Sequence, residues 1–146
     1  MRIAGEWRVC DDGVTRPALR GKVQAAAGAY HVDVFLVDSC ADRTVFSENL
    51  LSRLGFPMTP APESMVLQGI SRACGFVVVK TVIELTRDDA VPIHMRGEFA
   101  AFTDPTATDL SILGRDVLNH FDVILSRRRN EVLLLAPNHE YRVELI

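Results

Sequence analysis

The chain has 146 residues, of which 48% are apolar and 24% are charged, and its net charge is −3. This size and balance are typical of one globular domain, so we expect a single domain over residues 1–146. The mildly acidic composition indicates no nucleic-acid partner, and no apolar run reaches the roughly 20 residues that a membrane helix needs. Charged side chains occupy residues 1–8, where a secretion signal would be apolar, and we therefore expect a cytoplasmic protein.

Short strands between turn residues dominate the sequence, which predicts a mostly β fold. In chain order, we expect strands over residues 7–10, 17–23, 30–37, 65–67, 76–85, 93–102, 123–125, 132–135 and 141–145. Asp11-Asp12-Gly13 predicts a hairpin turn because glycine accepts a positive φ. Residues 32–37 are almost all apolar, which favours burial of that strand on both faces.

Two short helices are expected among the strands. Ser47 is a favourable N-cap, Glu48 follows it in the first turn, and Gly55 would end that helix. Residues 114–121 predict a second helix of one to two turns. Three prolines at positions 57, 60 and 62 make the intervening segment a loop.

Several polar segments are interpreted as turns. Gly69, Ser71, Arg72 and Gly75 lie between residues 65–67 and 76–85, which suits an exposed hairpin connection. Residues 88–90 predict another turn. The basic run at 127–129 is followed by Asn130 between two apolar strands, so we interpret it as a solvated hairpin turn rather than a phosphate-binding patch.

The sequence offers no metal-binding pattern. The cysteines form no C-x-x-C pair, no histidine stands near them at ligand spacing, and the histidines are scattered over different elements. We therefore expect neither a metal nor a cofactor. The residues concerned are Cys10, Cys40, Cys74, His31, His94, His120 and His139.

Two separated motifs point to one chemistry. The apolar strand at 30–37 runs into Asp38-Ser39-Cys40-Ala41-Asp42, and a later apolar strand ends in Ile112-Leu113-Gly114-Arg115-Asp116. This combination resembles the retropepsin-like, retroviral-type aspartic proteases in their bacterial and cellular form. The resemblance covers roughly residues 17–135. It implies a mostly β, closed-barrel acid-protease fold with a flap hairpin and one or two short helices.

The resemblance implies an aspartic endopeptidase with Asp38 as its catalytic residue. Hydrolysis by this chemistry needs two carboxylates that share a proton. Asp38 is the only aspartate followed by serine or threonine in the chain. The second carboxylate would then come from Asp38 of another copy, which implies a homodimer that acts on a peptide or protein substrate.

Further residues receive roles from the same resemblance. Ser39 would hydrogen-bond across the two-fold axis, and Ala41 belongs to the active-site loop. Asp42 and Arg115 would form a supporting ion pair. The flap that closes over substrate would contain Gly69, Ile70, Ser71, Arg72 and Gly75. From the neighbouring strand residues Leu36, Val66, Val77 and Ile112, we expect apolar walls and hence apolar substrate residues at the scissile bond.

Cys40 departs from the family, which has glycine at this position. A side chain there would crowd the cleft or require an unfavourable backbone angle. The alternative reading is therefore a catalytically inactive dimer of the same fold that binds peptides or serves as an assembly module. A thiol protease is disfavoured because no histidine stands at a recognisable position to activate Cys40. A redox clamp between Cys40 and Cys74 is a further, less favoured alternative.

Overall fold

The computed structural model describes residues 1–57 and 75–137. Short strands make up most of this part of the chain, which confirms the mostly β prediction. The elements are β1 (Arg2–Ala4), β2 (Glu6–Val9), β3 (Thr15–Gln24), β4 (Tyr30–Val37), β5 (Val45–Phe46), α1 (Glu48–Leu54), β6 (Phe76–Thr86), β7 (Pro92–Phe102), β8 (Ser111–Leu113), α2 (Arg115–Leu118), β9 (Asp122–Ser126) and β10 (Glu131–Leu135). The strands expected at 65–67 and 141–145 lie outside the described residues.

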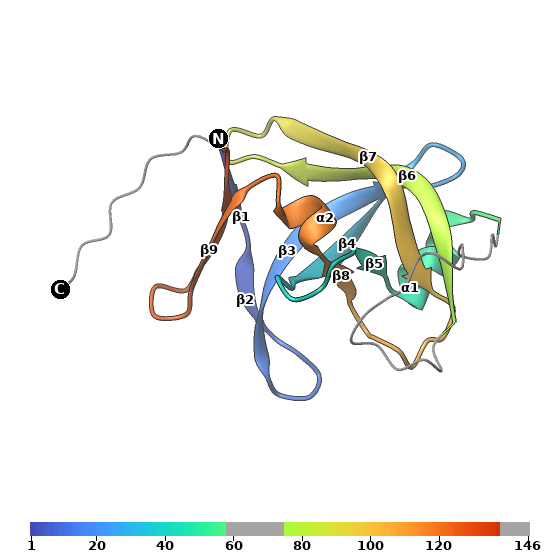
Figure 1. The fold of residues 1–146 in the computed structure, drawn as a ribbon, viewed down its shortest axis with the longest axis horizontal. Coiled ribbons are helices and arrows are strands. Elements are labelled where there is room, and N and C mark those ends of the chain that lie inside the picture. Colours follow the sequence, from blue (N-terminus) through green and yellow to red (C-terminus); the bar gives the residue numbers. More distant parts are fainter. Residues whose placement is uncertain (58–74, 138–146) are drawn as a thin grey trace.

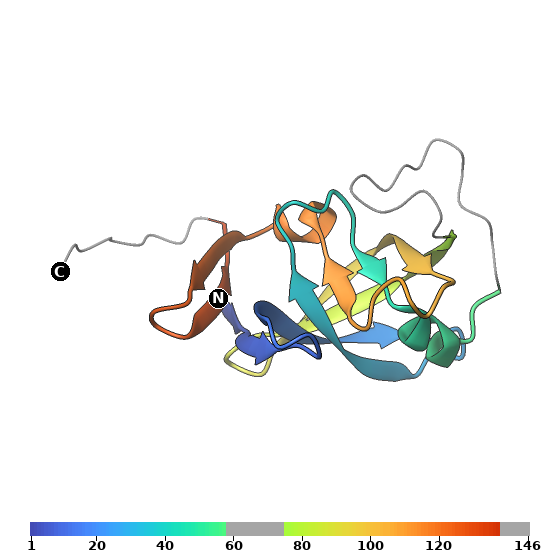
Figure 2. The same ribbon diagram turned by 90° about the horizontal axis from the view of Figure 1, so that it is seen from below.

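The strands form two sheets. The smaller one has the order β1-β10-β9, and the larger has the order β2-β3-β4-β8-β5-β7-β6. A further antiparallel pairing joins β3 to β6 through Lys22 with Glu84 and Val23 with Ile83. The larger sheet thereby returns on itself, and six of its strands form a ring. The three-stranded sheet lies at one end of the molecule and α1 at the other (Figures 1 and 2).

The ring encloses one main hydrophobic core. Fully buried large side chains come to it from α1 and from seven strands, β1, β3, β4, β5, β6, β8 and β10. The rings of Phe35 and Phe46 meet edge-on in this core, with centroids 6.2 Å apart. Leu50 and Leu54 of α1 enter the same core. Burial of this apolar surface is the main stabilising contribution to the fold.

Local sequence signals act as expected at α1 and at the first hairpin. The Ser47 hydroxyl accepts a hydrogen bond from the Leu50 amide at 3.2 Å, and Gly55 ends the helix with a φ of 67°. Gly13, with a φ of 78°, lies in the turn between β2 and β3.

Two sequence predictions differ from the structure. The second helix is shorter than expected, because after Leu118 the amides of His120 and Phe121 bond three residues back and the chain leaves as a turn into β9. β4 is also less buried than its apolar run indicates: Val32 is 54% exposed, and burial on both faces is therefore wrong for the start of the strand. Among the described residues, no helix has the length and apolar character that crossing a bilayer requires.

Candidate active site

Asp38 lies where two parallel strands end side by side. β4 pairs with β8 in parallel, with Val37 opposite Leu113, and the Asp38 amide donates to the Leu113 carbonyl at 3.1 Å. Because both strands end at the same edge, the segments that follow them are brought together. Figure 2 shows the loop after β4 beside α2.

The Asp38 carboxylate is held by its own loop. Its Oδ1 atom accepts hydrogen bonds from the Cys40 amide at 2.9 Å and from the Ala41 amide at 3.3 Å. Within the described part of the chain, no hydrogen bond reaches Oδ2. The residue is half-buried. One oxygen is therefore fixed by backbone donors, while the other has capacity for a ligand or a water.

Ser39 and Cys40 are exposed at the tip of this loop. Outside glycine, the described residues with a positive φ are Ala90 and Asn130, so Cys40 does not adopt the left-handed conformation. The backbone strain considered for a side chain at this position is therefore absent. The Cys40 thiol is free and exposed beside Asp38.

Asp42 and Arg115 connect the Asp38 loop to α2. Their side chains form an ion pair and are both about half exposed. Two backbone hydrogen bonds join the same segments: the Arg115 amide donates to the Ala41 carbonyl at 2.9 Å, and the Asp116 amide donates to the Asp42 carbonyl at 3.2 Å. The loop is thus tied to the start of α2 at two successive residues.

A polar network centred on the buried Thr44 joins it to Asp116. Both Asp116 carboxylate oxygens accept from the Thr44 amide, at 2.9 and 3.0 Å, and Oδ1 also accepts from the Thr44 hydroxyl at 2.7 Å. That hydroxyl in turn accepts from the Gly114 amide at 3.0 Å. The sequence predicts no role for Thr44, because a single threonine gives no indication of a partner far along the chain.

A second polar network supports β4 and β8 from the side of α1. The Ser111 hydroxyl donates to Asp33 at 2.6 Å and accepts from the Ser47 amide at 3.0 Å. Asp33 also forms an ion pair with Arg53 at 3.3 Å. The sequence offers one signal of this network, the acidic Asp33 within the apolar run of β4. A carboxylate that is largely removed from water requires hydrogen-bond or ion-pair partners.

The expected flap falls almost entirely outside the described residues, including Gly69, Ile70, Ser71 and Arg72. Gly75 is described and is exposed just before β6. Its carbonyl accepts from the amide and the hydroxyl of Thr103, at 3.2 and 3.1 Å. Gly75 is therefore fastened to the end of β7.

The residues expected to form apolar walls have different surroundings. Val77 is only 7% exposed and belongs to the core. Leu36 and Ile112 are opposite each other on β4 and β8 and are half-buried. Leu36 also lines a pocket of about 530 Å³ whose other walls are mostly polar. Val66 lies outside the described residues.

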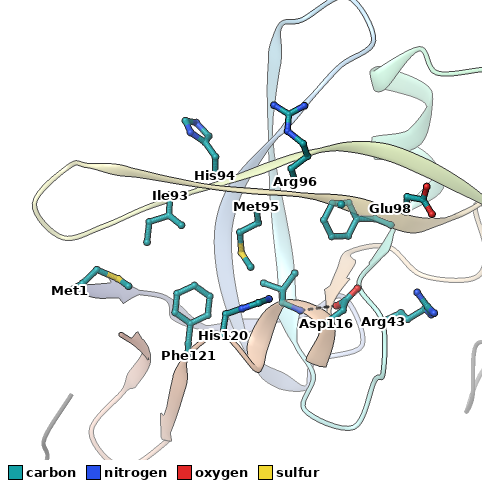
Figure 3. A pocket seen from close by; sticks show the side chains of 13 residues that line it. Met1, Arg43, Ile93, His94, Met95, Arg96, Glu98, Asp116, His120 and Phe121 are labelled. Atoms are coloured by element: carbon teal, nitrogen blue, oxygen red, sulfur yellow. Dashed lines mark hydrogen bonds between the residues drawn. The ribbon is translucent and has the colours of Figure 1, made fainter. Parts of the chain in front are cut away.

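Another pocket, of about 520 Å³, lies between β7 and the segment from α2 to Phe121 (Figure 3). Ile93 and Met95 point into it toward Phe121, whereas His94 and Arg96 point away. Asp116 reaches its edge but is already bonded to Thr44. The described residues contain no group of three His, Cys, Asp or Glu side chains that could hold a metal ion.

Comparison with known proteins finds no matching family model and no matching curated protein. Among solved structures, a retropepsin-like aspartic protease from Rickettsia conorii matches with a TM-score of 0.58 and 14% identity, over 92% of this chain and 89% of that chain. The EIAV protease complexed with the inhibitor HBY-793 matches with a TM-score of 0.46 and 18% identity, over 71% of this chain and 86% of that chain. At these identities the likeness concerns the fold. The chain has the retropepsin-like fold that its two sequence motifs predict.

Proposed function

We propose that the protein is an aspartic endopeptidase that works as a homodimer with one Asp38 carboxylate from each subunit. The observation that carries the proposal is the held carboxylate of Asp38, with Oδ1 fixed by two amides in a loop that is tied to α2. A catalytic group needs such a fixed position, because misplacement of a reacting atom lowers the rate steeply.

The chemistry requires a second carboxylate. Two carboxylates close together cannot both ionise cheaply, so the pair shares one proton and supplies both a base and an acid. The base takes a proton from water as its oxygen attacks the peptide carbonyl, and the acid protonates the carbonyl oxygen. The amide nitrogen leaves after it is protonated in turn.

The aspartates that flank the loop support a second copy as the source of this carboxylate. Asp42 is paired with Arg115, and Asp116 is bound to Thr44. Neither is available to share a proton with Asp38. A two-fold axis beside Asp38 would supply an identical group, with Ser39 of each subunit placed to hydrogen-bond across it.

Cys40 favours one second candidate, a catalytically inactive dimer that binds peptides or serves in assembly. Its exposed side chain belongs to the loop that holds Asp38 and would take up volume where a substrate has to approach that carboxylate. Since its backbone is unstrained, this candidate rests on the volume of the thiol alone. The variant Cys40→Gly removes that volume and tests the point.

The test is cleavage of a mixed peptide library between pH 4 and 7, with sedimentation of the same samples to measure the oligomeric state. Asp38→Asn is the matched control, because the amide oxygen can still accept from Cys40 and Ala41 while the negative charge is lost. We expect cleavage by the native dimer and none by Asp38→Asn. Cleavage by Cys40→Gly but not by the native protein would favour the inactive dimer. If the native protein and Cys40→Gly are both dimeric and neither cleaves, the proposed endopeptidase function is wrong.

A further inference from the structure

The pocket of about 530 Å³ takes one wall residue, Leu36, from the end of β4. Side chains alternate along a strand, so Leu36 and Asp38 project to the same side, with Cα atoms roughly 7 Å apart. The walls come from the β2–β3 hairpin and from the segment before β8, and include Arg8, Asp11, Arg16, Thr108 and Asp109. We call this the hairpin pocket. Leu36 lies two residues before the candidate catalytic Asp38 and connects the hairpin pocket to it.

Two of the five charged side chains that line the hairpin pocket, Arg16 and Asp12, are paired with each other. Arg16 donates twice to Asp12, at 2.8 and 2.7 Å. The hydrogen bonds from Arg16 and from the Val14 amide lower the pKa of Asp12 to about 2, so the pair stays charged at any working pH. Arg8 lies 3.7 Å from Glu6, which does not line the pocket and is also 3.9 Å from Arg20.

Two carboxylates remain. Asp11 and Asp109 are both exposed, come from opposite walls of the pocket, and form no ion pair with any residue in the described ranges. The wall that carries Asp109 begins in a structured turn, since the amide and hydroxyl of Thr106 both donate to Asp104, at 2.8 and 2.7 Å. With Arg8 included, three acidic and two basic side chains line the pocket, so its net charge is −1.

We infer that the hairpin pocket receives a lysine or arginine side chain of the substrate, next to the scissile bond; this inference rests on the proposed endopeptidase function. The aliphatic part of such a side chain would pack on Leu36 and Ala107, and its cationic end would lie between Asp11 and Asp109. Norleucine offers the same aliphatic length without the charge. The pocket thus selects a basic residue where the sequence alone predicts an apolar one.

The test compares peptides that are identical except for lysine, norleucine or glutamate at one position beside the cleaved bond. We expect kcat/KM to follow the order lysine, norleucine, glutamate. The variants Asp11→Asn and Asp109→Asn should each reduce the lysine-to-norleucine ratio by up to about fivefold, and the double variant further, as expected for charge pairs near the surface. Asp122→Asn removes an exposed carboxylate from β9 and is the matched control, with an unchanged ratio.

Binding separates this inference from the proposed function. Fluorescence anisotropy with the Asp38→Asn protein measures the same peptides without hydrolysis. Preferential binding of the lysine peptide that Asp11→Asn and Asp109→Asn abolish would support the pocket even if the native chain cleaves nothing. Asp38-dependent cleavage without a preference for lysine would contradict the inference about the hairpin pocket and leave the proposed endopeptidase function standing. A preference for lysine that Asp11→Asn and Asp109→Asn both leave intact would have the same meaning. Equal binding of all three peptides would also overturn the inference.

Discussion

Asp116 binds Thr44 through three hydrogen bonds, two to the backbone amide and one to the hydroxyl. Thr44 has no exposed surface, and its hydroxyl also accepts from the Gly114 amide. The buried Thr44, just after the Asp38 loop, is therefore joined to the start of α2 by the carboxylate of Asp116. Hydrogen bonds to a charged group are stronger than neutral ones, so this pair contributes to holding the two segments of the site together.

Thr44→Val should lower the free energy of unfolding by about 2–3 kcal/mol, because it removes one hydrogen bond to Asp116 and leaves the buried Gly114 amide without an acceptor. Thr44→Ser keeps the hydroxyl and should cost about 1 kcal/mol for the lost methyl group. Urea unfolding of the three proteins measures the difference. Equal losses for valine and serine would contradict a role for the hydroxyl.

Gly114→Ala should destabilise the fold more than any other glycine substitution in a strand or at a helix start. A Cβ atom at Gly114 would lie 2.3 Å from the backbone carbon of Arg43 and 2.8 Å from the Thr44 amide nitrogen. The backbone of the Thr44 segment would have to move, and we expect a loss of roughly 3 kcal/mol or more. Gly97→Ala is the control, because its Cβ would meet only the Phe99 ring, at 3.2 Å. Similar melting temperatures for the two variants would show this reasoning to be wrong.

Loss of the Asp42–Arg115 ion pair should affect catalysis more than stability. Both side chains are about half exposed, so Arg115→Met or Asp42→Asn should change the free energy of unfolding by no more than about 1 kcal/mol. If the proposed function holds, a less fixed Asp38 loop should lower kcat/KM by roughly tenfold or more. The double variant Asp42→Arg with Arg115→Asp exchanges the two charges and can restore the ion pair. We expect it to recover part of the kcat/KM that each single variant loses. Unchanged kcat/KM in both single variants would exclude a positioning role.

Glu84 should make the free energy of unfolding decrease at acidic pH. Hydrogen bonds from Lys22, at 2.8 Å, and from His94, at 3.0 Å, lower the pKa of Glu84 below its ordinary value of 4.5. A lowered folded-state pKa contributes stability that is present above the unfolded value and is lost as the pH falls through the folded value. Glu84→Gln should therefore lower the melting temperature by roughly 2–4 °C at pH 7, for an ion pair that contributes about 1 kcal/mol. The difference should disappear well below pH 4, and a constant difference across that range would contradict the linkage.

Helix ends, turns and the extents of the long strands could be predicted from the sequence, because they depend mainly on residues that are close along the chain. Ser47 and Gly55 bound α1 as expected, because capping and a positive φ are decided within a few residues. The same holds for the turn at Gly13 and for the extents of β3, β4, β6 and β7, which differ from the expected ranges by only a few residues.

What depends on distant partners was missed. β1 and β5 have three and two residues and are strands only because other segments pair with them. Thr44 and Ser111 acquire their roles in the same way. The polar walls beside Leu36 come from the β2–β3 hairpin and from residues 106–110, and neither segment adjoins β4 in the sequence, which is why apolar walls were expected.

The length of chain that separates the two halves of the site has a consequence for its assembly. Thr44 and Asp116 are 72 residues apart, and the parallel pairing of β4 with β8 joins equally distant segments. Contacts of this kind form late, because the entropy of closing a long loop opposes them until the intervening strands have paired. A chain still emerging from the ribosome therefore has Asp38 and its loop but lacks the segment at α2 to which the loop is tied. The candidate active site takes shape only after residues 111–116 have been synthesised, which delays any hydrolytic activity until the rest of the domain has formed.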